Sequence, residues 1–155
     1  MTTAVQDKIE REAVYRQPVE RVWSALTEPD QLKKWFGSNT AEIDLRPGGA
    51  MHLVWEDMDA RAIVHTVNPT SHLAWRWKPG GIEDDKSRPL AEQGPLTLVQ
   101  FFLEPVDGGT RLRVVESGFS AFTEEQRIEA LAQNNGGWDA CLEGLARLLG
   151  SADGR

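Results

Sequence analysis

Two helical patterns at opposite ends of the chain, with strand-like segments between them, constrain the fold most. Near the start, apolar residues recur at i, i+3, i+4 and i+7: Val19, Val22, Trp23 and Leu26. Near the end, a second apolar series has helical spacing: Trp138, Leu142, Leu145 and Leu149. Both series are typical of amphipathic helices that bury one face. The sequence of 155 residues shows no linker and no internal repeat, so we expect one domain over residues 1–155.

The ends of the other helices are also marked in the sequence. A second short helix after Pro29 carries Trp35 and Phe36 and should end at Gly37. Thr123 begins a capping-box pattern that predicts the start of a C-terminal helix. Because a glycine costs about 1 kcal/mol relative to alanine inside a helix, we expect the 134–137 segment (NNGG) to loosen or break it.

Seven segments of the chain have the composition of strands. They are residues 8–16, 41–46, 50–56, 60–68, 72–78, 96–104 and 110–117. Short connections rich in glycine, proline and aspartate join most of them, which favours an antiparallel meander. Residues 79–95 are polar, rich in proline and glycine, and longer than most loops. They are interpreted as a surface loop, with a flap over an opening as the alternative.

The charge and hydropathy of the chain limit its partners. With 17 basic and 24 acidic residues, the net charge of −7 argues against binding to nucleic acid. No apolar run approaches the length of a membrane span, and the first twenty residues lack a signal-peptide core. The single cysteine, Cys141, fits a reducing compartment. We therefore expect a cytoplasmic protein without a membrane span.

Several short motifs occur in a characteristic order along nearly the whole chain. They lie at residues 18–23, 26–29, 32–37, 43–49, 73–75, 109–112, 116–119 and 137–142. In order and spacing the sequence resembles the activator of heat-shock-protein-90 ATPase homologue-like family, within the START-like (SRPBCC) superfamily. The resemblance implies an α+β helix-grip fold: a seven-stranded antiparallel sheet curls around a long C-terminal helix, with two short helices after the first strand. It also implies a cavity between the sheet and that helix. The superfamily includes lipid carriers, polyketide cyclases and stress proteins, so the fold does not fix a function.

Six tryptophans are the main compositional oddity, and most tryptophans fill a core. The alternative is that several aromatic side chains line an apolar pocket, together with Leu142 of the C-terminal helix. The aromatic candidates are Trp35, Phe36, Trp75, Trp77, Phe102 and Trp138. Such a pocket would bind mainly through burial of apolar surface.

Two polar residues are candidate anchors in this cavity. Strand alternation with Leu112 and Val114 places Glu116 on the inward side of the last strand. A buried carboxylate there needs a partner, and Arg113 or His65 is a candidate. His65 faces inward in only one of two registers of its strand; in the other, the inner face is formed by Ala62, Val64 and Thr66. For both anchors, a solvated or satisfied structural role is the simpler interpretation.

The sequence has no signature of a metal or cofactor site. His52, His65 and His72 lack the spacing of metal ligands, and Cys141, expected to be a buried inert thiol, has no partner cysteine. No nucleotide-binding or nucleophile-elbow fingerprint occurs. We expect no metal and no cofactor.

The sequence thus predicts a small-molecule-binding domain for an apolar or aromatic ligand. An enzyme of cyclase or dehydratase type in the same cavity is the alternative, with Glu116 or His65 as its acid or base, although nothing in the sequence demands catalysis. A chaperone-ATPase-interacting protein is a third reading that rests on the family name. Whether the chain forms a homodimer is left open.

Overall fold

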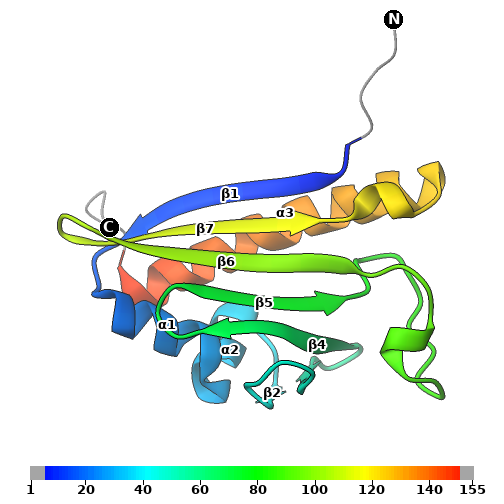
Figure 1. The fold of residues 1–155 in the computed structure, drawn as a ribbon, viewed down its shortest axis with the longest axis horizontal. Helices are drawn as coiled ribbons and strands as arrows, with labels where there is room; N and C mark the ends of the chain where they lie inside the picture. The colour runs from blue at the N-terminus through cyan, green and yellow to red at the C-terminus, as the bar shows by residue number, and fades with distance from the viewer. Residues whose placement is uncertain (1–5, 151–155) are drawn as a thin grey trace, which may run out of the picture.

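A computed structural model describes residues 6–150, which form one antiparallel sheet and three α-helices (Figure 1). The strands are β1 (Lys8–Tyr15), β2 (Thr40–Ile43), β3 (Ala50–Val54), β4 (Asp59–Asn68), β5 (His72–Trp77), β6 (Thr97–Val106) and β7 (Gly109–Ser117). Their order across the sheet is β1-β7-β6-β5-β4-β3-β2. Strands β2 to β7 form a meander, and β1 joins its far edge beside β7. The predicted helix-grip fold is confirmed, with seven strands close to their expected bounds.

Two short helices follow β1 and pack at one end of the sheet. They are α1 (Val19–Thr27) and α2 (Pro29–Phe36). Gly37 ends α2 with φ 72°, in the left-handed region that glycine adopts without a steric penalty, as the sequence predicted. In Figure 1, α1 and α2 lie near the C-terminal end of the long helix α3 (Glu124–Leu149).

Helix α3 runs the length of the sheet without interruption. The capping box is confirmed: Thr123 Oγ1 accepts from the backbone N–H of Gln126 at 3.2 Å, and the Gln126 side chain accepts in return. The predicted break at residues 134–137 is wrong. Asn135 accepts a hydrogen bond from Arg11 at 2.8 Å and donates to the Leu131 carbonyl, while Asn134 also bonds outside the helix. These tertiary contacts offset the low helix propensity of the segment.

Aromatic rings fill the centre of the space between the sheet and α3. Trp75 and Phe101, both fully buried on adjacent strands, have ring centroids 5.0 Å apart. Phe101 also meets Trp138 of α3 at 5.8 Å, and Trp35 stacks on Phe36 at 4.1 Å. The rings in the middle of the fold therefore form a packed core.

Helix α2 approaches α3 closely at Gly144. A Cβ atom at this position would lie 2.8 Å from the carbonyl oxygen of Trp35, closer than real contacts allow. Trp35 lies near the end of α2, and its ring stacks on Phe36. The close approach of its backbone to Gly144 therefore fixes where the end of α2 lies over the sheet.

Two glycine substitutions on α3 test the close approach. We expect Gly144→Ala to lower the free energy of unfolding by about 1–3 kcal/mol, since the methyl group forces the helix backbones apart. Gly136→Ala should raise it by about 0.5–1 kcal/mol, because a Cβ there meets nothing within 4 Å. Urea unfolding of both variants measures the difference. A neutral or stabilising Gly144→Ala would contradict the proposed constraint.

Candidate ligand-binding site

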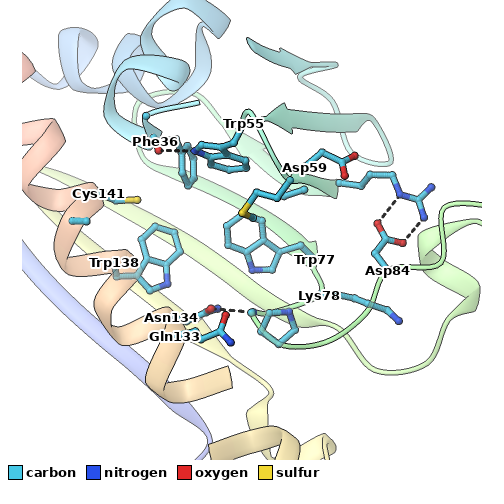
Figure 2. A pocket seen from close by; sticks show the side chains of 18 of the residues that line it. Phe36, Trp55, Asp59, Trp77, Lys78, Asp84, Gln133, Asn134, Trp138 and Cys141 are labelled. Atoms are coloured by element: carbon cyan, nitrogen blue, oxygen red, sulfur yellow. Dashed lines mark hydrogen bonds and ion pairs between the residues drawn. The ribbon is translucent and has the colours of Figure 1, made fainter. Parts of the chain in front are cut away.

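A cleft of about 700 Å³ lies where α2, α3 and one end of the sheet meet. Its walls come from the end of α2, the turn between β3 and β4, the end of β5, the loop after β5, and the middle of α3 (Figure 2). Its apolar lining includes Trp35, Phe36, Trp55, Met58, Trp77, Ile82 and Trp138. Its charged lining consists of Lys34, Asp59, Arg61, Lys78, Asp84, Lys86 and Arg147.

Phe36 is the centre of the aromatic wall. The centroid of its ring lies 6.4 Å from that of Trp55, 6.2 Å from that of Trp77 and 6.3 Å from that of Trp138. Figure 2 shows these rings arranged around the same space. Phe36, Trp55 and Trp77 are only half-buried, so part of their apolar surface is open to a ligand.

Glu116 of β7 is the buried carboxylate behind this wall, and its side chain is inward as predicted. It is 0% exposed. Its Oε1 accepts from Trp138 Nε1 and Asn134 Nδ2, both at 2.8 Å, and its Oε2 accepts from Trp77 Nε1 at 2.9 Å and Thr97 Oγ1 at 2.6 Å. Four donors therefore replace the water that the carboxylate loses on burial.

Neither of the partners expected for Glu116 contacts it. Arg113 lies on the outer face of β7 and pairs with Glu10 at 3.4 Å. Within residues 6–150, Glu116 forms no salt bridge, and all four of its partners are uncharged. The indole rings of Trp77 and Trp138 line the cleft while their N–H groups point away from it, toward Glu116. Glu116 thus orients the wall without lining the cleft itself.

The 79–95 loop forms another wall and is tied to its neighbours. The guanidinium of Arg61 on β4 donates two hydrogen bonds to Asp84, at 2.8 and 2.5 Å. These bonds lower the pKa of Asp84 far below its ordinary value, with further contributions from Lys86 and Gln93, although partial burial opposes the shift. At the start of the loop, the Gly80 N–H donates to Asn134 Oδ1 at 3.0 Å.

Four of the predicted pocket residues line the cleft: Trp35, Phe36, Trp77 and Trp138. Trp75 lies behind them in the core, and Leu142 is half-buried on α3 outside the cleft. Phe102 is on the opposite face of the sheet, stacked on His72 at 4.5 Å, because its neighbour Phe101 takes the inward position.

His65 does not line the cleft, so its expected inward orientation is wrong. A register irregularity between Val64 and Thr66 marks a β-bulge at this residue, and the buried face of β4 carries Ala62 and Val64. His65 is exposed, and its Nδ1 lies 2.7 Å from Thr66 Oγ1. The structure has the alternative register only before the bulge, at Ala62 and Val64; beyond the bulge, Val67 rather than Thr66 packs against the core.

Several residues that line the cleft were not predicted from the sequence. Trp55 lies in a turn beside acidic residues, where a large aromatic side chain would ordinarily be exposed to water. A tryptophan in such a turn indicates a binding surface, and this is the sequence feature that could have identified it. Arg61 and Asp84 are separated by 23 residues, and no local pattern indicates that they pair.

Cys141 lines the cleft and is 9% exposed. Burial raises the pKa of its thiol to about 12, so the thiol is protonated at neutral pH. Over residues 6–150 there is no group of three side chains suited to hold a metal ion. None of the helices in this described part of the chain is both long enough and apolar enough to cross a membrane.

Replacing the buried carboxylate tests its network. In Glu116→Gln, the amide nitrogen cannot accept from the donors on its side, so we expect the free energy of unfolding to fall by about 2–4 kcal/mol. The control Glu104→Gln alters an exposed ion pair with Arg111 and should change it by at most about 1 kcal/mol. Equal effects in urea unfolding would contradict a structural role for Glu116.

The pH dependence of stability tests the Arg61–Asp84 pair. Because the folded-state pKa of Asp84 is depressed, its contribution is complete above the ordinary value of 3.8 and is lost as the pH falls below it. Asp84→Asn should therefore unfold more easily at pH 7, and its difference from the unmodified protein should shrink below about pH 4. The exposed Asp30→Asn is the control. A difference that is constant down to pH 2 would contradict this assignment.

Comparisons with known proteins agree with the fold. The solved structure of protein NE0264 from Nitrosomonas europaea is 26% identical, with a TM-score of 0.72 over 94% of this chain and 96% of that chain. The chain is also similar in fold to DynU16, a protein in the dynemicin biosynthetic locus (24% identity, TM-score 0.69, 92% and 47% coverage). A third similar fold is PFC0360w, an HSP90 activator from Plasmodium falciparum (18% identity, TM-score 0.74, 94% and 98% coverage).

The comparison with curated proteins finds no match. The family model described as "Activator of Hsp90 ATPase homolog 1-like protein" matches residues 16–150, which include every strand from β2 to β7 and all three α-helices. The chain belongs to this family.

Proposed function

We propose that this protein binds a small apolar or aromatic molecule in the cleft. The observation that carries the proposal is the half-buried aromatic wall of Phe36, Trp55 and Trp77 beside a space of about 700 Å³. This volume lies within the range typical of small-molecule sites, which are mostly apolar and carry a few polar groups.

The apolar wall is sufficient for measurable affinity. A ligand with one or two aromatic rings that loses about 200 Å² of apolar surface gains about 5 kcal/mol. That gain alone corresponds to a dissociation constant of about 0.2 mM. The entropy lost on association offsets part of it, so we expect dissociation constants of about 0.2 mM or weaker for ligands of this size held by burial alone.

The position of Glu116 favours binding over acid–base catalysis. General acid–base work requires a carboxylate within hydrogen-bond reach of the substrate. Glu116 lies behind the indole rings, and four donors already occupy its oxygens. With His65 exposed on the far side, the enzyme alternative loses both of its candidate groups.

A chaperone-related role has no comparable support. PFC0360w is an HSP90 activator, but at 18% identity its similarity concerns the fold. The location of DynU16 in a biosynthetic locus is compatible with a cleft for an aromatic molecule, and it too is similar to this chain in fold.

Gly137 allows a direct test, because it lines the cleft and a Cβ there meets nothing within 4 Å. We expect Gly137→Leu to place an isobutyl group in the cleft next to Trp138 and weaken binding of the uncharged fluorescent probe N-phenyl-1-naphthylamine at least tenfold. The variant should remain folded, since leucine is the better helix former. Titration of the probe, followed by its fluorescence and by quenching of tryptophan emission, measures the affinity.

Gly136→Leu is the matched control, because Gly136 is the adjacent exposed glycine and does not line the cleft. It should bind the probe as the unmodified protein does. The proposal fails if the unmodified protein does not bind the probe, or if Gly137→Leu binds it with unchanged affinity.

A further inference from the structure

The cleft has an excess of basic side chains, although the chain as a whole is acidic. Five basic residues and two acidic residues line it, whereas the formal net charge of the protein is −7. The basic side chains are Lys34, Arg61, Lys78, Lys86 and Arg147.

The two acidic side chains of the lining are already neutralised. Lys86 lies between them, 3.4 Å from Asp59 and 2.9 Å from Asp84. Arg61 pairs with Asp84, and His52 hydrogen-bonds Asp59 at 2.7 Å. This group of paired charges forms one side of the cleft and leaves no free carboxylate in its lining.

The other three basic side chains have no acidic partner within residues 6–150. Lys34 and Arg147 form no salt bridge there, and Lys78 uses its Nζ to donate to the Glu83 carbonyl at 2.7 Å. An ammonium group has three donors, so Lys78 keeps capacity for a further acceptor. Among the described residues, Glu116 is the only fully buried carboxylate, and its four donors enclose it behind the indole rings.

We infer that the ligand of the cleft is an amphiphilic acid, with an aromatic or alkyl body and one anionic head group such as a carboxylate. This inference rests on the proposed function. The body would lie against Phe36, Trp55 and Trp77. The head group would lie at the rim, either at the α2 end of the cleft near Lys34 and Arg147 or at the loop end near Lys78. An apolar wall lowers the effective dielectric around the head group, which strengthens its attraction to these cations.

The unpaired cations distinguish this cleft from a purely hydrophobic one. A neutral ligand would form no ion pair with the unpaired cations, and a cationic ligand would be repelled by them. A nucleic acid would meet the large negative charge of the remaining surface, which leaves a small acid as the anionic ligand that fits.

Two probes of nearly the same shape test the head group. 1-Anilinonaphthalene-8-sulfonate carries a sulfonate that N-phenyl-1-naphthylamine lacks. We expect the triple variant Lys34→Gln, Lys78→Gln, Arg147→Gln to bind the sulfonate probe at least fivefold more weakly. Its affinity for the neutral probe should stay within twofold of the unmodified protein. The sulfonate probe alone should lose affinity between 20 and 200 mM salt.

The controls assign each signal to the cleft. Arg76→Gln removes one positive charge from an exposed side chain of β5 outside the cleft, and it should leave both affinities unchanged. Gly137→Leu should weaken the binding of both probes at least tenfold. Displacement of the sulfonate probe at a lower concentration of decanoate than of decanol would extend the result from sulfonate to carboxylate.

The outcomes distinguish this inference from the proposal on which it rests. If the triple variant binds both probes as before, or weakens both equally, the anionic head group is refuted while binding in the cleft stands. If neither probe binds the unmodified protein, the proposed function itself fails. A shift confined to the sulfonate probe supports the inference.

Discussion

The hydrogen bonds to Glu116 connect helix α3 with three neighbouring strands of the sheet. Its four donors come from β5, β6 and α3, and the carboxylate itself belongs to β7. A fully buried carboxylate without a cation is stable only while these donors stay in place, since removing one leaves charge without compensation. The position of α3 over the sheet is therefore set by directional contacts as well as by apolar packing, which alone would tolerate sliding.

Asn134 extends this constraint to the loop after β5. Its Nδ2 donates to Glu116, and its Oδ1 accepts from the backbone N–H of Gly80. One side chain on α3 thus connects the buried carboxylate with a wall of the cleft. The segment that contains Asn134 has poor helix propensity, and its retention inside a continuous helix follows from these contacts rather than from local preference.

Periodicity and alternation predicted the helices and strands from the sequence because both report burial, and the family resemblance implied how they are arranged. For the same reason, alternation along β7 predicted which of its side chains face inward, and Glu116 is one of them. These patterns failed where the backbone departs from regular pairing: the bulge at His65 reverses which side of β4 faces the core. For the adjacent pair Phe101 and Phe102, composition could not decide which ring points inward. The Arg61–Asp84 pair depends on how a 17-residue loop folds back on β4, and local sequence does not encode that path.

In Trp77 and Trp138, the indole N–H group and the apolar ring surface have different roles. For Trp77 and Trp138, the N–H group is used by Glu116, so the ring cannot rotate without breaking a buried hydrogen bond. The apolar surface of the same rings is then presented to the cleft in a fixed orientation, at a centroid separation of 6.1 Å. A pre-oriented wall reduces the entropy that a ligand must overcome on binding. Recognition of a particular ligand can therefore depend on the rim, where Lys34, Lys78 and Arg147 can be substituted without disturbing the hydrogen bonds to Glu116.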